Sequence, residues 1–320
     1  MNSVARKLGL GRAAYLLWHL PRGKVAESVR AGGPLEQWRT ERGRREMEKA
    51  AWTLPVLPAC GGSPLEVHVL TGKRFWYQTG FCLWTFARAA GRDLAPCIYD
   101  DGTLTEEFTA PLVRLFPAVR VVTQKEILAR LDQHLPTARF PHLRERWLHY
   151  PNIRKLTDVH AGATGWKLVM DSDLLFFREP EFLLGWLDDP DRPLHAVDSE
   201  TSYGYPCELM ARLAGHELAE LVNVGLCGLR SDAVDWERLE HWCRVLIDRH
   251  GTHYFLEQAL VAMLVAGQRC AVAPVSDYLT CPRSPEVHGC NAVMHHYVAD
   301  SKRWYFRVNW RQALLTLRDP

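Results

Sequence analysis

Two aspartates stand two residues apart, between apolar runs, near the middle of the chain. The segment 167–177 reads KLVMDSDLLFF, so Asp171 and Asp173 follow one apolar run and precede another. In extended chain, side chains two residues apart project to the same side. Two carboxylates held together repel unless a cation lies between them, and carboxylate oxygens suit Mg²⁺ and Mn²⁺. The pattern predicts a divalent metal site, although Asp and Ser are also common in an ordinary solvated turn.

A second group of polar residues lies near the C-terminus, where 295–304 reads HHYVADSKRW. An imidazole here can serve as a third ligand to Mn²⁺, and Lys302 can neutralise a diphosphate as a point charge. A half-buried histidine beside a solvated basic loop is the plainer interpretation. A rival metal site is a zinc module, whose spacing matches no common zinc pattern. Its ligands would be Cys281, His288, Cys290 and His295 or His296.

The composition is that of a globular protein. Of the 320 residues, 47% are apolar and 24% are charged, which excludes a disordered or fibrous chain. Lys and Arg number 39 and Asp and Glu number 37, a balance that argues against a dedicated nucleic-acid binder. The charge is distributed unevenly, because residues 1–50 carry eleven Lys or Arg and only five Glu.

The basic N-terminal segment is expected to be a helical extension. A helical pattern from Val4 to Leu20 places Leu8, Tyr15 and Trp18 among basic residues. Such a helix would dock on the main domain, or else lie on an anionic membrane surface. No apolar run in the sequence is long enough to span a bilayer. The nine cysteines form no CxxC pair, so we expect a cytoplasmic protein, with peripheral membrane contact as an option.

From residue 66 onward the sequence alternates between strand-like and helical segments. Since such alternation favours an α/β domain, we expect a mostly parallel central sheet flanked by helices. Ligands of such sheets bind beyond the carboxyl ends of the strands. The expected strands are 67–70, 95–99, 119–122, 168–170, 194–197, 222–229 and 270–274. The expected helices are 80–90, 105–115, 125–131, 208–221, 235–249 and 255–266.

Several motifs occur in the order found in one enzyme family. The ending matches H-x-x-G-x-x-K-P-W without gaps, with Ala299 at the Gly position and Arg303 at the Pro position. Six earlier segments match further motifs of that family. In chain order these motifs are the first strand, an acidic turn into a helix, a basic residue before the next strand, L-D-x-D, N-x-G and D-Q-D. The matching segments are EVHVLT (66–71), DDGTLTEE (100–107), RKL (154–156), MDSD (170–173), NVG (223–225) and Glu257-Gln258.

Taken together, these segments resemble glycosyltransferase family 8, the retaining sugar-nucleotide-dependent enzymes that include glycogenin and bacterial galactosyltransferases. The resemblance implies a GT-A fold over residues 63–320, after a basic helical extension over residues 1–62. It implies a metal-dependent hexosyltransferase that uses a nucleoside-diphosphate sugar, UDP-linked, and a hydroxyl acceptor, with retention. The acceptor would be a glycan, lipid, protein or small molecule, and nucleic acid is not an expected partner.

The resemblance also assigns roles residue by residue. Asp171, Asp173 and His296 would bind Mn²⁺ or Mg²⁺. The nucleotide and its diphosphate would contact Thr71, Lys155, Ser172 and Lys302. Catalytic positions at the face where sugar is transferred would be Asn223, Glu257 and Gln258, and the turn at 198–200 (DSE) is a weaker candidate for the donor sugar.

The sequence departs from the family pattern at several of these positions. Gly72-Lys73-Arg74 follows the first strand, where the family often has an acidic residue for the nucleobase or ribose. In the D-Q-D triplet Glu257 replaces the first Asp and Ala259 the last. The altered Gly, Pro and Asp positions leave open a catalytically silent member that binds a nucleotide sugar or a protein partner through the same fold.

Overall fold

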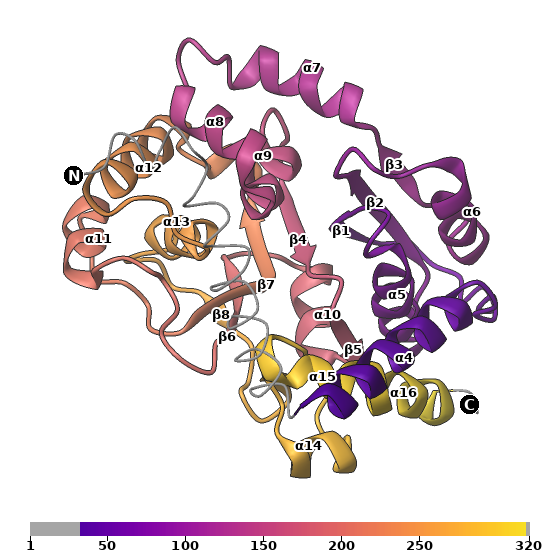
Figure 1. The fold of residues 1–320 in the computed structure, drawn as a ribbon. Coiled ribbons are helices and arrows are strands. Elements are labelled where there is room, and N and C mark those ends of the chain that lie inside the picture. Colours follow the sequence, from indigo (N-terminus) through magenta and orange to yellow (C-terminus); the bar gives the residue numbers. More distant parts are fainter. Residues whose placement is uncertain (1–32, 318–320) are drawn as a thin grey trace, which may run out of the picture.

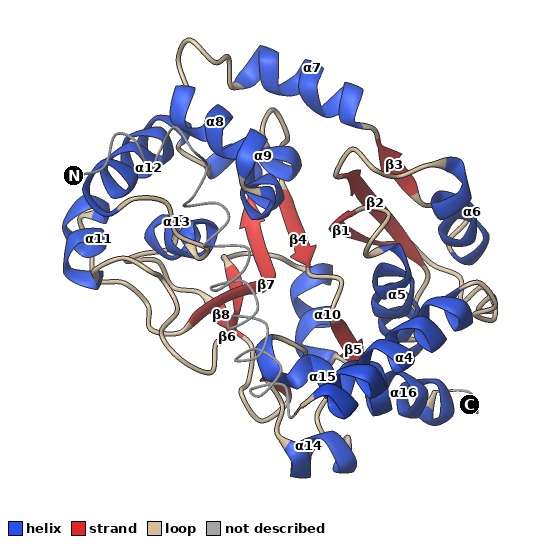
Figure 2. Cartoon of the chain, in the orientation of Figure 1, coloured by secondary structure: helices blue, strands red, loops and turns tan. Residues whose placement is uncertain are grey.

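A sheet of seven strands runs through the centre of the computed structural model, which describes residues 33–317 (Figures 1 and 2). Strand β7 is antiparallel to both of its neighbours, and the other strands run parallel to one another. The predicted mostly parallel sheet is therefore confirmed. In spatial order the strands are β3 (Arg120–Val122), β2 (Leu94–Asp100), β1 (Leu65–Thr71), β4 (Trp166–Met170), β7 (Val222–Arg230), β6 (Leu194–Val197) and β8 (Ala271–Val272).

A small second sheet lies beside the central one and was not predicted from the sequence. It consists of β5 (Leu174–Phe176), β10 (Met294–His296) and β9 (Tyr278–Thr280). Strand β10 is antiparallel to β5 and parallel to β9. Each strand is three residues long, too short for an alternating pattern to be visible in the sequence.

Helices cover both faces of the central sheet, which explains why its strands are apolar on both sides. In β4, Leu168 and Met170 belong to one hydrophobic core and Val169 belongs to the other. The helices that contribute to the first core are α4 (Pro34–Ala51), α5 (Trp76–Ala90), α6 (Glu106–Leu115), α10 (Glu181–Asp188) and α16 (Trp310–Thr316). Those of the second are α7 (Gln124–His134), α8 (Pro141–His149), α9 (Arg154–His160), α11 (Cys207–Ala214), α12 (Trp236–His250) and α13 (Leu256–Leu264).

The helix expected over 208–221 was too long. Its counterpart α11 ends at Ala214, because Gly215 adopts a left-handed conformation (φ 77°) that stops the helix. The other five expected helices are present with shifted ends. Among residues 33–317, no helix combines the length and the apolar character that crossing a bilayer requires.

Helix α4 lies within the predicted N-terminal extension and packs on the body of the domain. Its buried residues Met47 and Ala51, with Leu54 just beyond, belong to the first core. The helix lies against the π-helical turn η5 (Tyr305–Asn309), which follows the short helix α15 (Lys302–Trp304). The domain boundary at residue 62 stays a prediction, and the pattern over 4–20 lies outside the described residues.

The close approach of α4 to η5 depends on a glycine. A Cβ on Gly43 would lie 2.3 Å from the carbonyl oxygen of Phe306, and real Cβ atoms do not approach an oxygen so closely. Replacing Gly43 by Ala should therefore lower the free energy of unfolding by about 1–3 kcal/mol, because the helix must move away. Denaturant unfolding of the variant would measure the loss.

Gly185 is the matched control, since it lies in helix α10 and a Cβ added there would have no atom within 4 Å. At this position Ala should raise the free energy of unfolding by up to about 1 kcal/mol through its higher helix propensity. Equal effects of the two substitutions would contradict the packing described for Gly43.

Candidate active site

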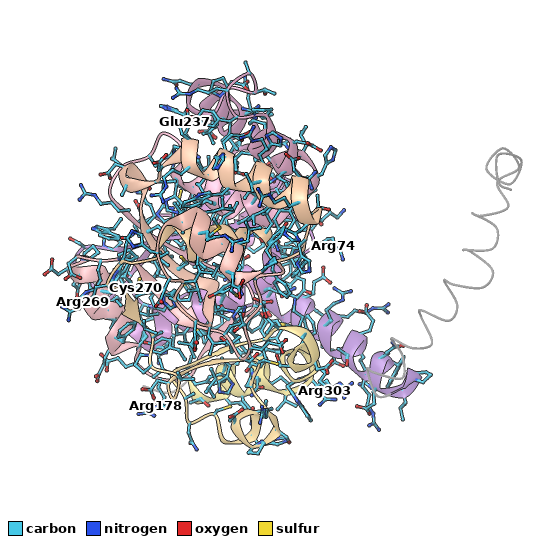
Figure 3. The ribbon with its side chains drawn as sticks, turned by 90° about the vertical axis from the view of Figure 1, so that its left-hand side faces the viewer. Arg74, Arg178, Glu237, Arg269, Cys270 and Arg303 are labelled. Atoms are coloured by element: carbon cyan, nitrogen blue, oxygen red, sulfur yellow. The ribbon has the colours of Figure 1, made fainter. Side chains whose placement is uncertain are left out.

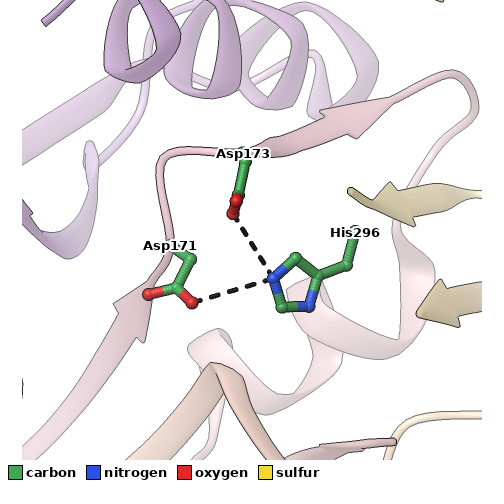
Figure 4. Close-up of side chains that lie close together, drawn as sticks. All are labelled: Asp171, Asp173 and His296. Carbon is green, nitrogen blue, oxygen red and sulfur yellow. Dashed lines mark ion pairs between the residues drawn. The ribbon is translucent and has the colours of Figure 1, made fainter. Parts of the chain in front are cut away.

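The two aspartates of the metal pattern lie in the short turn that joins β4 to β5. Asp171 follows the last residue of β4, and Asp173 precedes the first residue of β5. The backbone N–H of Asp171 donates to the carbonyl of Gly225 in β7, at 2.8 Å. Both carboxylates point toward a common centre, as their spacing predicts (Figure 4). The turn stands at the carboxyl end of β4, where α/β sheets bind ligands.

His296 reaches this turn from the far end of the chain through the pairing of β10 with β5. In that pairing His296 stands opposite Leu174, and the N–H of Tyr297 donates to the carbonyl of Asp173 at 3.0 Å. The ring nitrogen Nε2 lies 3.3 Å from Asp173 Oδ1 and 3.7 Å from Asp171 Oδ2 (Figure 4). The structure thus brings together the three residues expected to bind the metal.

Gly225 makes room for the imidazole of His296. A Cβ at this position of β7 would lie 2.1 Å from Cε1 of the ring. The N–H of Gly225 is held by the side-chain oxygen of Asn223, at 2.9 Å. The N-x-G motif therefore serves a steric need, because any larger residue would push the histidine out of place.

The ligand atoms of these three side chains fit a divalent cation. Neither ring nitrogen of His296 has a hydrogen-bond partner, although both are buried, and a buried polar atom is rarely left unpaired. One ligand atom from each of Asp171, Asp173 and His296 lies within 4.8 Å of the others. Two carboxylate oxygens and an imidazole nitrogen form a ligand set that suits Mn²⁺ or Mg²⁺.

Two lysines pair with the two aspartates from opposite sides. Lys302 Nζ lies 3.1 Å from Asp173 Oδ2, and Lys155 Nζ lies 2.9 Å from Asp171 Oδ1. Burial on its own would raise the pKa of Asp173, but His296 and Lys302 outweigh it and hold that pKa well below its usual range. The Asp173 carboxylate in turn raises the pKa of Lys302. Both lysines therefore carry a positive charge at the site.

Lys155 also contacts Glu257, which the sequence placed in the catalytic group. Its Nζ lies 3.4 Å from Glu257 Oε2, and both side chains are buried. Burial raises the pKa of Glu257 to about 7, with Lys155 opposing this rise and Asp171 adding to it. For Lys155, burial alone would lower the pKa, but Asp171 and Glu257 outweigh burial and raise it. The ammonium group of Lys155 thus lies between the carboxyl groups of Asp171 and Glu257.

These side chains line a cavity of about 400 Å³. Gln258 is fixed inside it, since its Nε2 donates to Asp198 Oδ2 at 3.0 Å and to the carbonyl of Ser202 at 2.9 Å. The cavity holds eight of the ten predicted site residues, and the turn at 198–200 also lines it. The eight are Lys155, Asp171, Asp173, Asn223, Glu257, Gln258, His296 and Lys302.

Thr71 and Ser172 do not line this cavity. Thr71 is buried at the end of β1, and its hydroxyl accepts a hydrogen bond from Thr79 at 2.8 Å. Ser172 stands between the two aspartates, where its carbonyl accepts from the hydroxyl of Tyr305 at 3.4 Å. Their assignment to the nucleotide stays a prediction.

Three aromatic residues of the cavity were not identified from the sequence: Tyr150, Tyr254 and Phe255. Tyr150 donates a hydrogen bond to the carbonyl of Tyr254 and accepts one from the N–H of Glu257. Tyr254 is 70% exposed, so it forms part of the rim. No motif marks these residues, because aromatic side chains are equally common in a core.

The residues of the alternative zinc module contact different partners. His288 packs edge-on against Trp304, and His295 Nδ1 lies 3.0 Å from the hydroxyl of Tyr297. The thiol of Cys290 bonds to the carbonyl of Val287. Within the described part of the chain, the group Asp171, Asp173 and His296 is the one that brings three candidate ligand atoms together.

Ala299 occupies the position where the C-terminal motif has glycine, and its backbone shows why glycine is expected. Its φ is 46°, in the left-handed region, which costs an L-residue about 1–2 kcal/mol. Ala299→Gly should therefore raise the free energy of unfolding by about 1 kcal/mol, which thermal or denaturant unfolding would measure. Ala211→Gly in helix α11, the control, should lower it by about 1 kcal/mol. A loss of stability in both variants would contradict the strain at Ala299.

Comparisons with known proteins place the fold. No protein-family model and no curated protein matches the sequence. Mouse xyloside xylosyltransferase 1, in its apo form, superposes with a TM-score of 0.52 at 13% identity, over 75% of this chain and 99% of that one. The galactosyltransferase LgtC, in complex with donor and acceptor sugar analogues, superposes with a TM-score of 0.50 at 13% identity, over 79% and 95%. The predicted GT-A fold, the fold of these glycosyltransferases, is thereby confirmed.

Proposed function

We propose that this protein is a metal-dependent glycosyltransferase. It would move a hexose from a nucleoside-diphosphate sugar, UDP-linked, to a hydroxyl acceptor, with retention as in the family that its motifs resemble. The observation that carries the proposal is the convergence of Asp171, Asp173 and His296 with two lysines in one cavity. That cavity lies at the carboxyl end of β4, in a fold shared with a xylosyltransferase and a galactosyltransferase.

The metal ligands would be Asp171, Asp173 and His296. A bound Mn²⁺ or Mg²⁺ supplies positive charge to the diphosphate that leaves the sugar. Lys302 adds a second charge from the protein itself. Its ammonium group is near Asp173, and its side chain is 44% exposed, so it can turn toward a phosphate oxygen. Preorganised positive charge at the leaving group is the main catalytic aid that this arrangement offers.

The opposite wall of the cavity would hold the sugar. Gln258 is fixed by Asp198 and Ser202, which leaves its amide oxygen free to accept from a sugar hydroxyl. Asn223 holds the N–H of Gly225 and keeps its amide N–H₂ group for a ligand. Glu257 is a positioning residue in this proposal, because Lys155 balances its charge and both side chains are buried.

The nucleoside would lie toward Thr71 and Ser172. Thr71 ends β1, the neighbour of β4 in the sheet, and Ser172 belongs to the turn that carries Asp171 and Asp173.

All nine cysteines are free thiols in the structure, which supports the expected reducing compartment.

Removal of both aspartates should abolish donor binding. For the wild-type protein, a UDP-hexose at a hundred times its Kd adds about 2.7 kcal/mol of stability with Mn²⁺ present. The variant Asp171→Ala/Asp173→Ala should show no Mn²⁺-dependent rise in Tm with the same ligand, because the cation has lost its carboxylates. The variant Asp188→Ala/Asp189→Ala removes two exposed carboxylates from the end of α10 and should respond like the wild type.

Undiminished donor binding by the Asp171→Ala/Asp173→Ala variant would overturn the assignment.

A measurement of activity separates the proposed enzyme from the catalytically silent alternative. Slow Mn²⁺-dependent hydrolysis of UDP-hexose by the wild-type protein supports the enzyme. Tight binding with neither hydrolysis nor transfer, across a panel of acceptors, would support the silent protein instead.

Gly225→Ala tests the geometry without removing a ligand. The added Cβ meets the ring of His296, so Mn²⁺ affinity should fall by roughly tenfold or more, the size of effect seen when the support of a metal ligand is disturbed. Isothermal titration with MnCl₂ measures this. Gly80→Ala is the control, because a Cβ there would lie an ordinary 3.7 Å from Leu112. Wild-type Mn²⁺ affinity in Gly225→Ala would count against His296 as a ligand.

A further inference from the structure

Helix α4 separates its charges by face. Its outward stripe consists of residues spaced three and four apart, which places them on one side of a helix. We call this stripe the α4 face; its residues are Leu35, Trp38, Arg42, Arg45, Lys49 and Trp52, the last being the C-cap residue. All six are exposed, with Trp38 at 57% and Leu35 at 59%. The four glutamates of the helix are only partly exposed.

Most of the charge on those glutamates is neutralised by arginines. Glu36 pairs with Arg307 and Glu46 with Arg311, both from the C-terminal helices. Glu41 and Glu48 pair with Arg44 of α4 itself. Arg42 and Arg45 of the α4 face also pair with Glu46 and Glu41. Because Arg307 and Arg311 share the charge of Glu36 and Glu46, cations still outnumber carboxylates along the helix.

The α4 face is held rigidly to the domain. Gly43 touches the backbone of η5, and Met47 and Ala51 are buried on the inner side of the helix. A ligand therefore meets a preformed surface and does not have to order it, which lowers the entropic cost of binding.

The basic and apolar character continues beyond α4. The ring of Trp52 packs against that of Trp76 in α5, with 4.6 Å between centroids, and the residues just before α5, 73–75 (KRF), are all exposed. Figure 3 shows α4 standing out from the body on the side that also carries Arg74 and Arg303. Along the sequence, residues 1–32 contain six Lys or Arg and a single acidic residue.

We propose that the α4 face docks the protein on an anionic membrane surface. Tryptophan favours the boundary between headgroups and hydrocarbon, and the α4 face has one near each end. Between them, three cations match the negative potential of anionic lipids. A helix that lies flat with its apolar side chains at this depth and cations beside them is the usual form of an interfacial helix. The charge is confined to this region of a nearly neutral chain, which does not suit a nucleic-acid groove.

Vesicle co-sedimentation of the full chain tests this inference. Vesicles of phosphatidylcholine with phosphatidylglycerol should bind the wild-type protein at low salt, and pure phosphatidylcholine should bind it far less. The variant Arg42→Gln/Arg45→Gln/Lys49→Gln should bind the anionic vesicles on the order of a hundredfold more weakly, at about fivefold per cation. Its binding should also depend less on salt. Trp38→Ala should weaken binding several-fold and leave the salt dependence unchanged.

The control removes the same charge from the opposite end of the molecule. Lys125 on α7 and Arg244 and Arg249 on α12 are exposed, and Lys125→Gln/Arg244→Gln/Arg249→Gln should bind the vesicles like the wild type. Circular dichroism of each variant would verify the fold. Wild-type affinity in the α4 triple variant, or an equal loss in the control, would overturn the proposal. So would unaltered binding by Trp38→Ala together with equally tight binding of soluble polyglutamate, since that result identifies a site for acidic protein.

Discussion

The pairing of β10 with β5 is the contact on which the rest of the site depends. The two aspartates are neighbours in the chain and meet through local geometry. His296 is far from them in sequence, and it reaches them because three residues of β10 pair with β5, the strand that starts directly after the aspartates. Two further features fix the position of His296. The N–H of Tyr297 donates to the carbonyl of Asp173, and Gly225 leaves space for the imidazole ring. A backbone ladder thus sets the position of an imidazole that makes no hydrogen bond of its own.

Charge balance is the second constraint. Three carboxylates, those of Asp171, Asp173 and Glu257, lie in one cavity and would repel one another strongly at low dielectric. The chain offsets them with Lys155 before the aspartates in sequence and Lys302 after them. Without a cation at the centre, the two lysines carry this positive charge. In the proposed function, a bound cation would take over this charge at Asp173, and Lys302 would then be available to a diphosphate.

Much of this arrangement was predictable from the sequence, and the reasons differ by residue. Asp171 and Asp173 were identified by their own spacing, although they lie in a short turn and not in the extended chain that the i, i+2 rule assumes. His296 and Lys302 were identified through a resemblance, since nothing local tells which of two adjacent histidines faces a distant turn. Tyr150 and Tyr254 could not be found at all, because their role comes from tertiary position. The three-residue strands that build the site were also invisible, being shorter than any period that could reveal them.

The contact of α4 with η5 and α16 has a consequence for folding during translation. Residues 36–51 are translated well before their partners at 305–311, which lie more than 250 residues further along the chain. Until then α4 can pack on α5, but its contact with η5 is missing and the side of the cavity that carries Lys302 does not exist. Contacts so distant in sequence form slowly, because a long loop must close before they contribute any stability. The cavity should therefore form only after residues 294–311 have been translated, so a shorter nascent chain would lack His296 and Lys302.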